Sequence, residues 1–337
     1  MVTLKEIAKA AGVSTATVSN VINGKENHVS EETVSHIREI IQQLGYIPNE
    51  AARSLAQRKT RVVALIQQGA PGENILTNPY NAVYIGALTS CLSKKGYYPM
   101  IRVTDDYKSI EQDIRGWNVA GCLFSGSFGV NLKHLQFLKT VPVVFADCYL
   151  EFPDVNVVAL DDEAGGRLAG DYLTDMGHRR IAFIASSLKY SEVDQHRLSG
   201  FRESLARHGL SMPDAFIYPD SNLDQYMDRL ANLMADPGTR PTAFFCCADI
   251  TAAILIKRFG QLGLRVPQDV SILGFDNLPL ASYCTPCLTT ISQDIPAKAE
   301  AVTDMLIRHI EDIQQPPERV LLGVRIVERE SVARIQP

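Results

Sequence analysis

The sequence predicts a small all-α N-terminal unit followed by an α/β body of two doubly wound lobes, each built on a parallel sheet. Two patterns predict this class. Over the first sixty residues, apolar side chains recur at helical spacing between capping residues and glycines. From Arg61 onward, short apolar runs alternate with amphipathic segments, which is typical of parallel strands covered by helices on both faces. A length of 337 residues also favours more than one domain.

The first two helices are defined by their capping residues. Thr3 and Glu6 have the spacing of a capping box, and Gly12 is placed to end the helix that they begin. Ser14 then caps a second helix, which runs to about Asn23. A helix, a tight turn and a second helix at this spacing predict a helix-turn-helix unit.

A third helix is expected from Ser30, which caps it, to Gly45, which ends it. Pro48 separates it from a shorter helical stretch over residues 49–57. The apolar positions of the third helix that are expected to face the core are Val34, Ile37, Ile41 and Leu44.

The body is expected to form two α/β lobes with a binding cleft between them. Polar side chains at the carboxyl ends of the strands would line that cleft. The expected strands span 61–66, 97–103, 119–124, 141–145, 155–160, 180–185, 243–247 and 270–275. The expected helices lie at 81–95, 163–176, 198–208, 223–235 and 251–262.

The composition is that of an ordinary globular protein, with 46% hydrophobic and 21% charged residues. Seven cysteines, odd in number and scattered, favour reduced thiols over a disulfide framework. No apolar run approaches the ~18 residues that span a membrane, and the N-terminal MVTLKEIAKAAG lacks the features of an export signal. We therefore expect a cytoplasmic protein with no membrane partner.

Charge is unevenly distributed along the chain. Residues 1–61 carry eight Lys and Arg against six acidic residues, a net charge of +2. The rest of the chain carries 25 basic against 32 acidic residues, a net charge of −7. A weakly basic unit on an acidic body indicates that only the N-terminal unit meets a polyanion.

The second helix suits close approach to double-stranded DNA. In a helix-turn-helix, this helix enters the major groove and its N-terminal residues contact base edges. The stretch STATVSNVIN, residues 14–23, offers the small side chains of Thr15, Ala16 and Thr17 there. Asn20 is suited to bidentate hydrogen bonds with an adenine. The alternative is a surface helix whose small residues carry no function.

The segment NEAARSLAQRKT, residues 49–60, favours DNA binding further. Its helical part is shorter than the ~12–15 residues of a marginally stable isolated helix, so it should order only against a partner. Leu55, its one large apolar residue, suits a wedge between base steps in the minor groove, with Asn49 and Arg53 as further DNA contacts. The alternative is an ordinary linker with Leu55 packed on the N-terminal unit.

These features resemble the LacI/GalR family of bacterial transcription regulators over nearly the whole chain. The resemblance implies a hinge helix after the helix-turn-helix and a bilobed effector-binding body similar to periplasmic sugar-binding proteins. It also implies a homodimer or a tetramer, whose paired N-terminal units read a near-palindromic operator. The matching stretches are TLKEIAKAAGVSTATVSNVINGK, YIPNEAARSLAQRKT, NPY, GHRRIAFI, RLSGF, LGLRVPQDVSILGFDN and TPCLTTISQD.

The resemblance also implies a division of the chain. The helix-turn-helix domain would span residues 1–47, the hinge helix and linker 48–60, and the effector-binding and dimerisation domain 61–337. Within the body, lobe 1 would comprise about 61–160 and 293–322, and lobe 2 about 161–292 and 323–335.

By position, Thr15, Ala16 and Asn20 match the base-reading residues of the family. Asn23 matches an asparagine that contacts phosphate, and Leu55 matches the leucine that intercalates at the operator centre. Asn20 stands where an arginine is often found, so the operator is expected to differ from the commonest half-site.

Aspartates follow three of the expected strands of the body, at Asp147, Asp249 and Asp276. With Arg197 they suit a hydroxyl-rich ligand, because carboxylates accept hydrogen bonds and a guanidinium donates them in a fork. Each aspartate has a second explanation as a helix N-cap. The residues that match effector-pocket positions of the family are Tyr80, Asp147, Arg197, Asp249, Asp276 and Gln293.

Two departures from the family pattern leave the effector open. Ala248 stands where an asparagine is usual, and Ser221, included among the effector contacts, lies near a position where some members have an aromatic residue. The sequence therefore predicts a sugar or sugar derivative as effector without naming one.

Catalysis, metal binding and cofactor binding have no support in the sequence. No Gly-rich phosphate loop, GxSxG elbow or HExxH motif is present. Cys284 and Cys287 form a lone CxxC ahead of a strand-like segment, without a second CxxC to complete a zinc site. We expect neither an enzyme nor a metal site, and no cofactor.

The sequence thus predicts a dimeric, sequence-specific DNA-binding repressor whose operator affinity is controlled by a small effector. A co-repressor-dependent regulator and an activator with a non-sugar effector remain alternatives. A solute-binding protein would share the body, but it would need an export signal and would lack the N-terminal unit.

Overall fold

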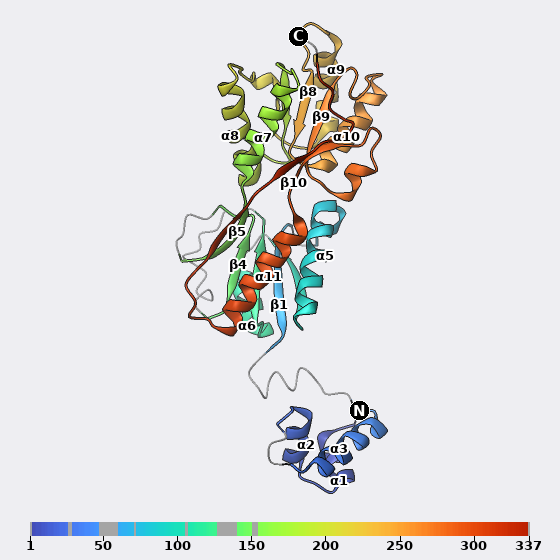
Figure 1. The fold of residues 1–337 in the computed structure, drawn as a ribbon, viewed down its shortest axis with the longest axis vertical. Helices are drawn as coiled ribbons and strands as arrows, with labels where there is room; N and C mark the ends of the chain where they lie inside the picture. The colour runs from blue at the N-terminus through green and yellow to red at the C-terminus, as the bar shows by residue number, and fades with distance from the viewer. Residues whose placement is uncertain are drawn as a thin grey trace. The chain divides into compact units, whose positions relative to one another are not determined.

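The computed structural model describes residues 2–25, 29–46, 60–70, 72–104, 107–126, 140–149 and 154–335. The chain divides into two compact units, Met1–Thr60 and Arg61–Pro337 (Figure 1). The helical stretch expected at 49–57 lies outside the described residues. Among the helices that are described, none has both the length and the apolar character needed to cross a membrane.

The N-terminal unit follows the capping signals of the sequence. Its described helices are α1 (Leu4–Ala11), α2 (Thr15–Ile22) and α3 (Glu31–Leu44). The capping box is confirmed, because the Glu6 carboxylate accepts the Thr3 backbone N–H at 2.7 Å and the Thr3 hydroxyl accepts the Glu6 N–H. Gly12 ends α1 with a φ of 67°, a left-handed conformation that favours glycine. Ser14 and Ser30 cap α2 and α3 as expected.

The core of this unit contains the apolar faces of all three helices. Ile7, Val18 and Ile37 are fully buried within it. Of the expected core positions of α3, Ile41 is partly buried and packs against this core beside the buried Ile40, whereas the expectation for Leu44 is wrong, since it is 40% exposed.

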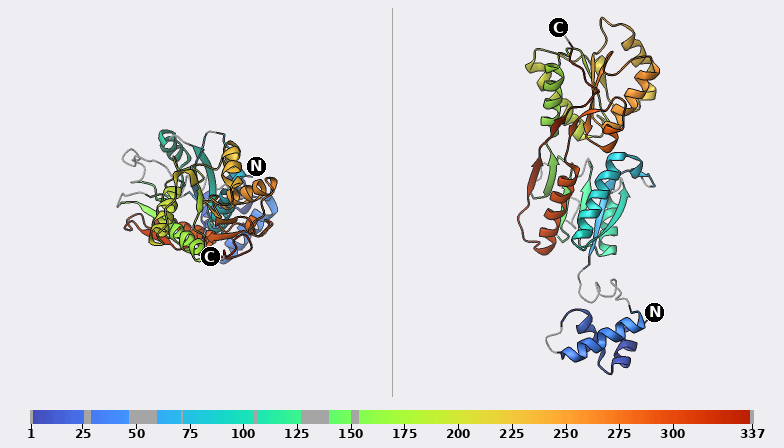
Figure 2. Two further views of the ribbon diagram at one scale, coloured as in Figure 1. Left: turned by 90° about the horizontal axis from the view of Figure 1, so that it is seen from above. Right: turned by 45° about the vertical axis from the view of Figure 1, so that its right-hand side comes forward.

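In the second unit, lobe 1 is a parallel six-stranded sheet with helices on both faces (Figures 1 and 2). The strand order is β11-β5-β4-β3-β1-β2. The strands are β1 (Val62–Gln68), β2 (Tyr98–Thr104), β3 (Gly121–Ser125), β4 (Val143–Ala146), β5 (Asn156–Leu160) and β11 (Arg319–Leu322). The helices are η1 (Ile75–Thr77), α5 (Pro79–Lys94), α6 (Tyr107–Trp117) and α11 (Ile295–Glu311).

Lobe 2 is a second six-stranded sheet in the order β12-β10-β9-β8-β6-β7, parallel except for the pairing of β10 with β12. The strands are β6 (Ile181–Ile184), β7 (Ile217–Tyr218), β8 (Ala243–Cys246), β9 (Ser271–Asp276), β10 (Thr289–Ser292) and β12 (Arg325–Val327). The helices are α7 (Asp162–Asp175), α8 (Glu192–Arg207), η4 (Asp214–Phe216), η5 (Leu223–Tyr226), α9 (Met227–Ala235), α10 (Asp249–Gln261) and η6 (Pro279–Ser282).

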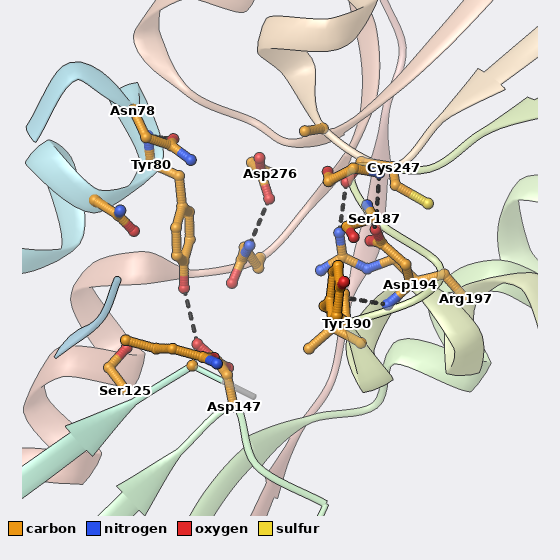
Figure 3. Close-up of a pocket in the computed structure, with 18 of the residues that line it drawn as sticks. Asn78, Tyr80, Ser125, Asp147, Ser187, Tyr190, Asp194, Arg197, Cys247 and Asp276 are labelled. Atoms are coloured by element: carbon orange, nitrogen blue, oxygen red, sulfur yellow. Dashed lines mark hydrogen bonds between the residues drawn. The ribbon is translucent and has the colours of Figure 1, made fainter. Parts of the chain in front are cut away.

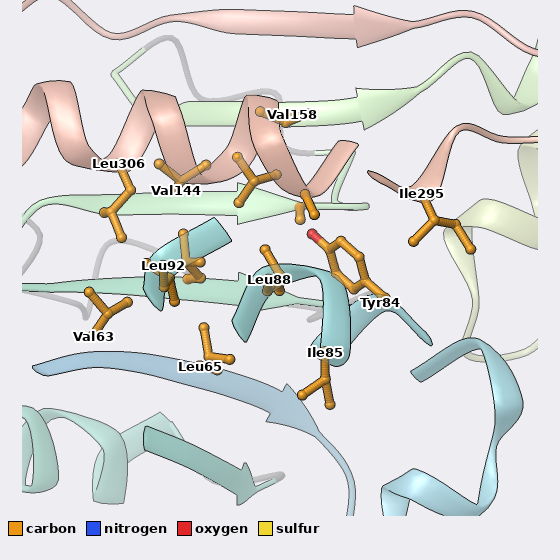
Figure 4. Close-up of a cluster of buried hydrophobic side chains, with 14 of the residues drawn as sticks. Val63, Leu65, Tyr84, Ile85, Leu88, Leu92, Val144, Val158, Ile295 and Leu306 are labelled. Carbon is orange, nitrogen blue, oxygen red and sulfur yellow. The ribbon is translucent and has the colours of Figure 1, made fainter. Parts of the chain in front are cut away.

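Helices α5 and α11 pack side by side on one face of the lobe 1 sheet (Figure 4). Tyr84, Leu88 and Leu92 recur every four residues along α5 and are at most 1% exposed. They share a core with Val302 and Leu306 of α11. Truncation of one such leucine to alanine costs about 2–5 kcal/mol, so this layer holds the lobe together.

The expected strands of the body are confirmed, with ends displaced by no more than two residues. The sequence analysis missed the strands β7, β11 and β12, which are two to four residues long and partly exposed. Helices α6 and α11 were also missed. The segment expected as a helix over 198–208 begins earlier, at Glu192, and 223–235 begins with the 3-10 turn η5 rather than as an α-helix.

The chain passes between the lobes at three places, after β5, after β10 and after β11. Each of these strands lies in one sheet, and the element that follows belongs to the other lobe (Figure 1). Three short crossovers leave the two sheets as separate layered bodies and bring the carboxyl ends of their strands to one site.

Candidate functional site

A cavity of about 300 Å³ lies between the lobes (Figure 3). In each sheet the strand order reverses between two neighbours, β1 and β3 in lobe 1 and β6 and β8 in lobe 2. Doubly wound sheets bind ligands at such switch points. The cavity is lined from both of them, by Gln67 and Ser125 in lobe 1 and by Ser186 and Cys247 in lobe 2.

The lobe 1 wall is organised around a buried ammonium group. Lys298 of α11 is 1% exposed, and its Nζ lies 2.8 Å from Asp147 Oδ2 and 3.0 Å from Gln293 Oε1. The same Nζ donates to the Tyr80 hydroxyl, which donates in turn to Asp147 at 3.0 Å. Burial raises the pKa of Tyr80 well above its ordinary value, so its hydroxyl stays protonated. This network fixes Tyr80 and Asp147 on one wall (Figure 3).

The opposite wall presents a buried guanidinium group. Arg197 of α8 is 6% exposed; its Nε donates to Asp162 Oδ1 at 2.7 Å and its Nη1 donates to the Cys247 carbonyl at 2.6 Å. The guanidinium carbon lies 3.5 Å from the centre of the Phe275 ring. Burial opposes the charge, but Asp162 and the other nearby carboxylates outweigh it and raise the pKa of Arg197. The cation is therefore held rigidly and permanently charged.

Glycines bring α7 and α8 close enough to form this ion pair. A Cβ on Gly166 would lie 2.0 Å from the Arg197 carbonyl oxygen, and a Cβ on Gly200 would lie 1.9 Å from the Glu163 carbonyl oxygen. Any side chain at these positions would push the helices apart. The close contact places Asp162, in the first turn of α7, beside Arg197.

Two further carboxylates line the cavity. Asp194 Oδ2 accepts the backbone N–H groups of Ser186 and Ser187, each at 2.7 Å. Asp276 Oδ1 accepts the Gln293 side-chain amide at 2.6 Å. Burial raises the pKa of both aspartates, with Arg197 acting in the opposite direction on each.

Backbone strain is concentrated at this cavity. Asp147 has a φ of 57°, Asp276 a φ of 117° and Asn277 a φ of 59°. Among non-glycine residues such positive φ values are uncommon and cost free energy, of the order of 1–3 kcal/mol each. All three residues end or directly follow central strands, so the strained backbone sets the direction of side chains at the strand ends.

The structure brings together most of the residues predicted for the effector. Tyr80, Asp147, Arg197, Asp276 and Gln293 all line the cavity. The sequence analysis began this helix at residue 198, just after Arg197, whereas Arg197 lies in its interior.

Two predicted effector residues lie elsewhere. Asp249 is fully buried, and its carboxylate accepts the Leu278 backbone N–H at 2.7 Å and the Thr290 hydroxyl at 2.6 Å, so it ties α10 to the sheet instead of facing the cavity. Ser221 is exposed in a turn outside the residues that line the cavity. Neither residue lines the cavity in this structure.

The sequence analysis missed Lys298, Asp194 and Asp162. A signal existed for two of them. Lys298 interrupts the buried stripe of α11 at helical spacing, and Ser191 and Asp194 have the spacing of a helix N-cap and its third residue. Nothing local in the sequence indicates that Asp162 faces Arg197, because their contact depends on how two helices pack.

Two histidines of the body, His178 and His196, have structural partners. His178 is buried between the Thr242 hydroxyl and the Ala333 carbonyl, and burial lowers its pKa to about 4. His196 stacks on Tyr149 with ring centres 3.8 Å apart. Cys284 and Cys287 are free thiols, and the described residues contain no cluster of metal-ligating side chains.

The N-terminal unit presents one face of α2 to solvent. Thr15, Ala16 and Asn20 are exposed and Thr17 is half-buried. Asn23 Nδ2 donates to the Ser19 carbonyl at 2.7 Å, close to the end of the helix. The predicted DNA contacts Asn49, Arg53 and Leu55 lie outside the described residues.

Two family models match the chain. The model described as bacterial regulatory proteins, lacI family, matches residues 3–49, and the model of a periplasmic binding protein-like domain matches residues 171–332. The first covers the helix-turn-helix and the second covers most of lobe 2.

Whole-chain comparisons agree with these matches. A ribose operon repressor of Haemophilus influenzae is 31% identical over 98% of this chain and 99% of its own length. The transcriptional repressor PurR of Escherichia coli is 32% identical over 99% of this chain and 97% of its own length. A crystal structure of the Lac repressor dimer bound to operator and an anti-inducer has 26% identity and a TM-score of 0.84, covering 98% of this chain and 99% of that one. This chain therefore belongs to the LacI family of bacterial transcription regulators, as a DNA-binding repressor under the control of a small effector and not as an enzyme.

Proposed function

We propose that this chain is a cytoplasmic, dimeric repressor whose operator affinity is set by a monosaccharide bound between the lobes. The observation that carries the proposal is the pairing of Arg197 and Asp276 with Asp147 across one cavity. A guanidinium fork and facing carboxylates supply the donors and acceptors that adjacent sugar hydroxyls require.

Each lining residue then has a role. Arg197 donates to hydroxyl oxygens, and Asp276 accepts from hydroxyl groups on the same wall. Asp147 and Tyr80, held by Lys298, contact the sugar from lobe 1. Gln293, in the crossover after β10, joins the two walls: its side-chain amide donates a hydrogen bond to Asp276, and its amide oxygen accepts one from Lys298.

The lining favours a sugar over a purine base. Tyr80 and Tyr190 are the aromatic residues among the described residues that line the cavity, and the rest are mostly polar. A flat purine needs apolar or aromatic faces on both sides. A volume of about 300 Å³ lies at the small end of the range for ligand pockets and suits a monosaccharide. The relatives named for the ribose operon support the same class.

The similarity to PurR supports a second candidate function, in which the ligand is a co-repressor that tightens operator binding. Both candidates use the same physical coupling. A ligand that contacts both walls favours one arrangement of the lobes, and the arrangement that it favours decides whether operator affinity falls or rises.

For the DNA side, we assign base contacts to Thr15, Ala16, Thr17 and Asn20, whose side chains lie on or beside the exposed face of α2. Asn23 is assigned to a phosphate. The hinge over 48–60 would insert Leu55 at the operator centre, with Asn49 and Arg53 beside it.

The domain division proposed from the sequence is retained. It gives a helix-turn-helix over 1–47, a hinge over 48–60 and a body over 61–337. Within the body, the chain crosses from one lobe to the other at about residues 160, 292 and 322. A dimer is favoured physically, since a unit of net charge +2 neutralises few phosphates and two linked units bind as one.

The test is a thermal-shift screen of the full chain against monosaccharides and purines, followed by operator-binding titrations with each stabilising compound at fixed salt. A sugar that stabilises the protein and changes its operator affinity would support the proposal. A purine that does so, with no sugar active, would overturn it.

A further inference from the structure

We propose that the cavity selects an uncharged polyhydroxy ligand and rejects anionic derivatives of that ligand, such as phosphate esters and sugar acids. This inference rests on the proposed function, since it takes a carbohydrate as the effector. It is carried by how the charges on the two walls are already paired.

Carboxylates outnumber cations around the cavity. The cations that line it, among the described residues, are Arg197 and Lys298. The carboxylates that line it are Asp147, Asp194 and Asp276, and Asp162 lies behind the wall as the ion-pair partner of Arg197. An anionic ligand would therefore enter a site with no excess of positive charge.

Lys298 is a cation in the cavity wall and could in principle bind a phosphate, but all of its hydrogen-bond donors already have partners. An ammonium group has three N–H donors. Its Nζ already contacts the Asp147 carboxylate, the Tyr80 hydroxyl and the Gln293 amide oxygen. At 1% exposure it has no room for a further partner. A phosphate could reach Lys298 only by displacing Asp147.

Arg197 offers donors to a ligand while its charge is already balanced. Asp162, 1% exposed, neutralises the guanidinium through the bond to Nε at 2.7 Å. A guanidinium has five N–H groups, and the bonds to Asp162 and to the Cys247 carbonyl use two of them. The remaining N–H groups suit the oxygen atoms of neutral hydroxyls.

Carboxylate oxygens on the cavity walls that accept no hydrogen bond from the described residues favour a ligand with hydrogen-bond donors. Among the described residues, hydrogen-bond donors reach Oδ2 of Asp194 and Oδ1 of Asp276, and the other carboxylate oxygen of each remains available. A sugar hydroxyl can donate to such an oxygen. A phosphate or carboxylate group has acceptors there instead, so it would be repelled and would lose its hydration without compensation.

Protonation of the buried aspartates does not reverse this balance. Burial raises the pKa of Asp249 and Asp276, which lie close enough to interact. Even with both of them neutral, Lys298 keeps Asp147 and Arg197 keeps Asp162 as ion-pair partners. Burial also raises the pKa of Asp194, against the backbone N–H groups that favour its charged form; with Asp194 neutral too, Asp147 and Asp162 still balance the two cations.

Among the described residues, Lys189 is a further cation beside the cavity. The ammonium group of Lys189 is 4.8 Å from the centre of the Tyr190 ring, and Tyr190 lines the cavity. Lys189 itself is exposed to solvent, where salt screens its charge within about 8–10 Å. It is therefore a poor substitute for a buried cation.

The test compares matched ligand pairs by isothermal titration calorimetry on the full chain. The probes are D-ribose against D-ribose 5-phosphate, and D-glucose against D-glucose 6-phosphate and D-glucuronate. We expect the neutral sugar of the responsive pair to bind at least tenfold more tightly than its anionic derivatives. An anionic derivative that binds as tightly as its parent, or more tightly, would overturn the proposal.

Two variants sharpen the test. Asp194→Asn removes one carboxylate charge from the cavity and should reduce the preference for the neutral sugar at least threefold. Asp228→Asn makes the same change on the exposed surface of α9 and should leave the preference unaltered. If both variants leave it unaltered, wall charge does not set specificity. If no sugar or sugar derivative binds but hypoxanthine does, the carbohydrate effector is itself wrong, a result distinct from tight binding of an ester.

Discussion

The carboxylate of Asp162 holds Arg197 on one oxygen and Tyr149 on the other. Arg197 Nε donates to Oδ1 at 2.7 Å, and the Tyr149 hydroxyl donates to Oδ2. Tyr149 follows the lobe 1 strand β4, whereas Asp162 and Arg197 belong to lobe 2. Asp162 thus binds Arg197 within lobe 2 and also connects lobe 2 to lobe 1 through Tyr149, beside the crossover after β5.

Asp162→Asn is expected to destabilise the body more than any change to a surface ion pair. Removal of one partner from a buried pair leaves an uncompensated charge, which costs about 3–5 kcal/mol. Urea denaturation of variant and parent at pH 7 measures the loss. Glu203→Gln, which breaks the exposed contact with Arg167, is the control and should cost less than about 1 kcal/mol. Equal losses for the two variants would contradict the assignment.

Tyr149→Phe is expected to weaken the response to effector with a smaller loss of stability than Asp162→Asn. The ring can still stack on His196, but its bonds to Asp162 and to the Leu160 carbonyl are lost. Loss of a hydrogen bond to a charged group typically lowers the free energy of unfolding by about 1.5–3 kcal/mol, less than the loss expected for Asp162→Asn. The measurement is the effector concentration that half-saturates the change in operator affinity, which should rise several-fold. Tyr98→Phe, at an exposed position on β2, should leave it unchanged.

Arg197→Lys is expected to abolish effector control while effector-free operator binding persists. Lysine retains the charge, but its tetrahedral ammonium group cannot reproduce the planar fork that bonds Asp162 and the Cys247 carbonyl while it directs further N–H groups at a sugar. Effector affinity should fall at least tenfold in calorimetry. Effector affinity equal to that of the parent would exclude Arg197 as a direct contact.

The sequence predicts the parts of this fold that depend on local chemistry. Capping residues define the ends of α1, α2 and α3, because a hydroxyl three residues before a backbone N–H satisfies it whatever surrounds the helix. Buried parallel strands are equally visible, since both of their faces must be apolar. The missed strands β11 and β12 lie at sheet edges, where one face needs no apolar residue.

The site is less predictable, because strand ends indicate which side chains lie near the cleft but not which way they turn. Asp249 and Asp276 both lie at strand ends, yet only Asp276 lines the cavity. The Leu278 N–H and the Thr290 hydroxyl capture the Asp249 carboxylate from segments about thirty to forty residues away. Lys298 and Asp162 were missed for the same reason, since their partners come from other parts of the chain.

Asn20→Ala is expected to reduce sequence discrimination without changing stability. The side chain is exposed on α2, and exposed substitutions usually change stability by less than about 0.5 kcal/mol. A bidentate contact to one base is worth about 1–3 kcal/mol of discrimination. Titrations of the selected operator and its single-base variants at fixed salt should show tolerance at one position of each half-site. Gln43→Ala on the exposed face of α3 is the control, and equal tolerance in both variants would remove Asn20 from the readout.

His178 is expected to contribute to acid sensitivity of the body. Burial lowers its pKa to about 4, below the unfolded value of about 6.5. Because the unfolded chain binds the proton more readily, the contribution is complete above about pH 6.5 and is lost as the pH falls toward 4. The shift corresponds to about 3 kcal/mol across that window. The free energy of unfolding of His178→Gln should therefore fall less steeply than that of the parent between pH 7 and 4. His36→Gln, on α3 of the N-terminal unit, serves as control, and identical slopes for parent and His178→Gln would mean that His178 is not held neutral by its burial against Thr242 and Ala333.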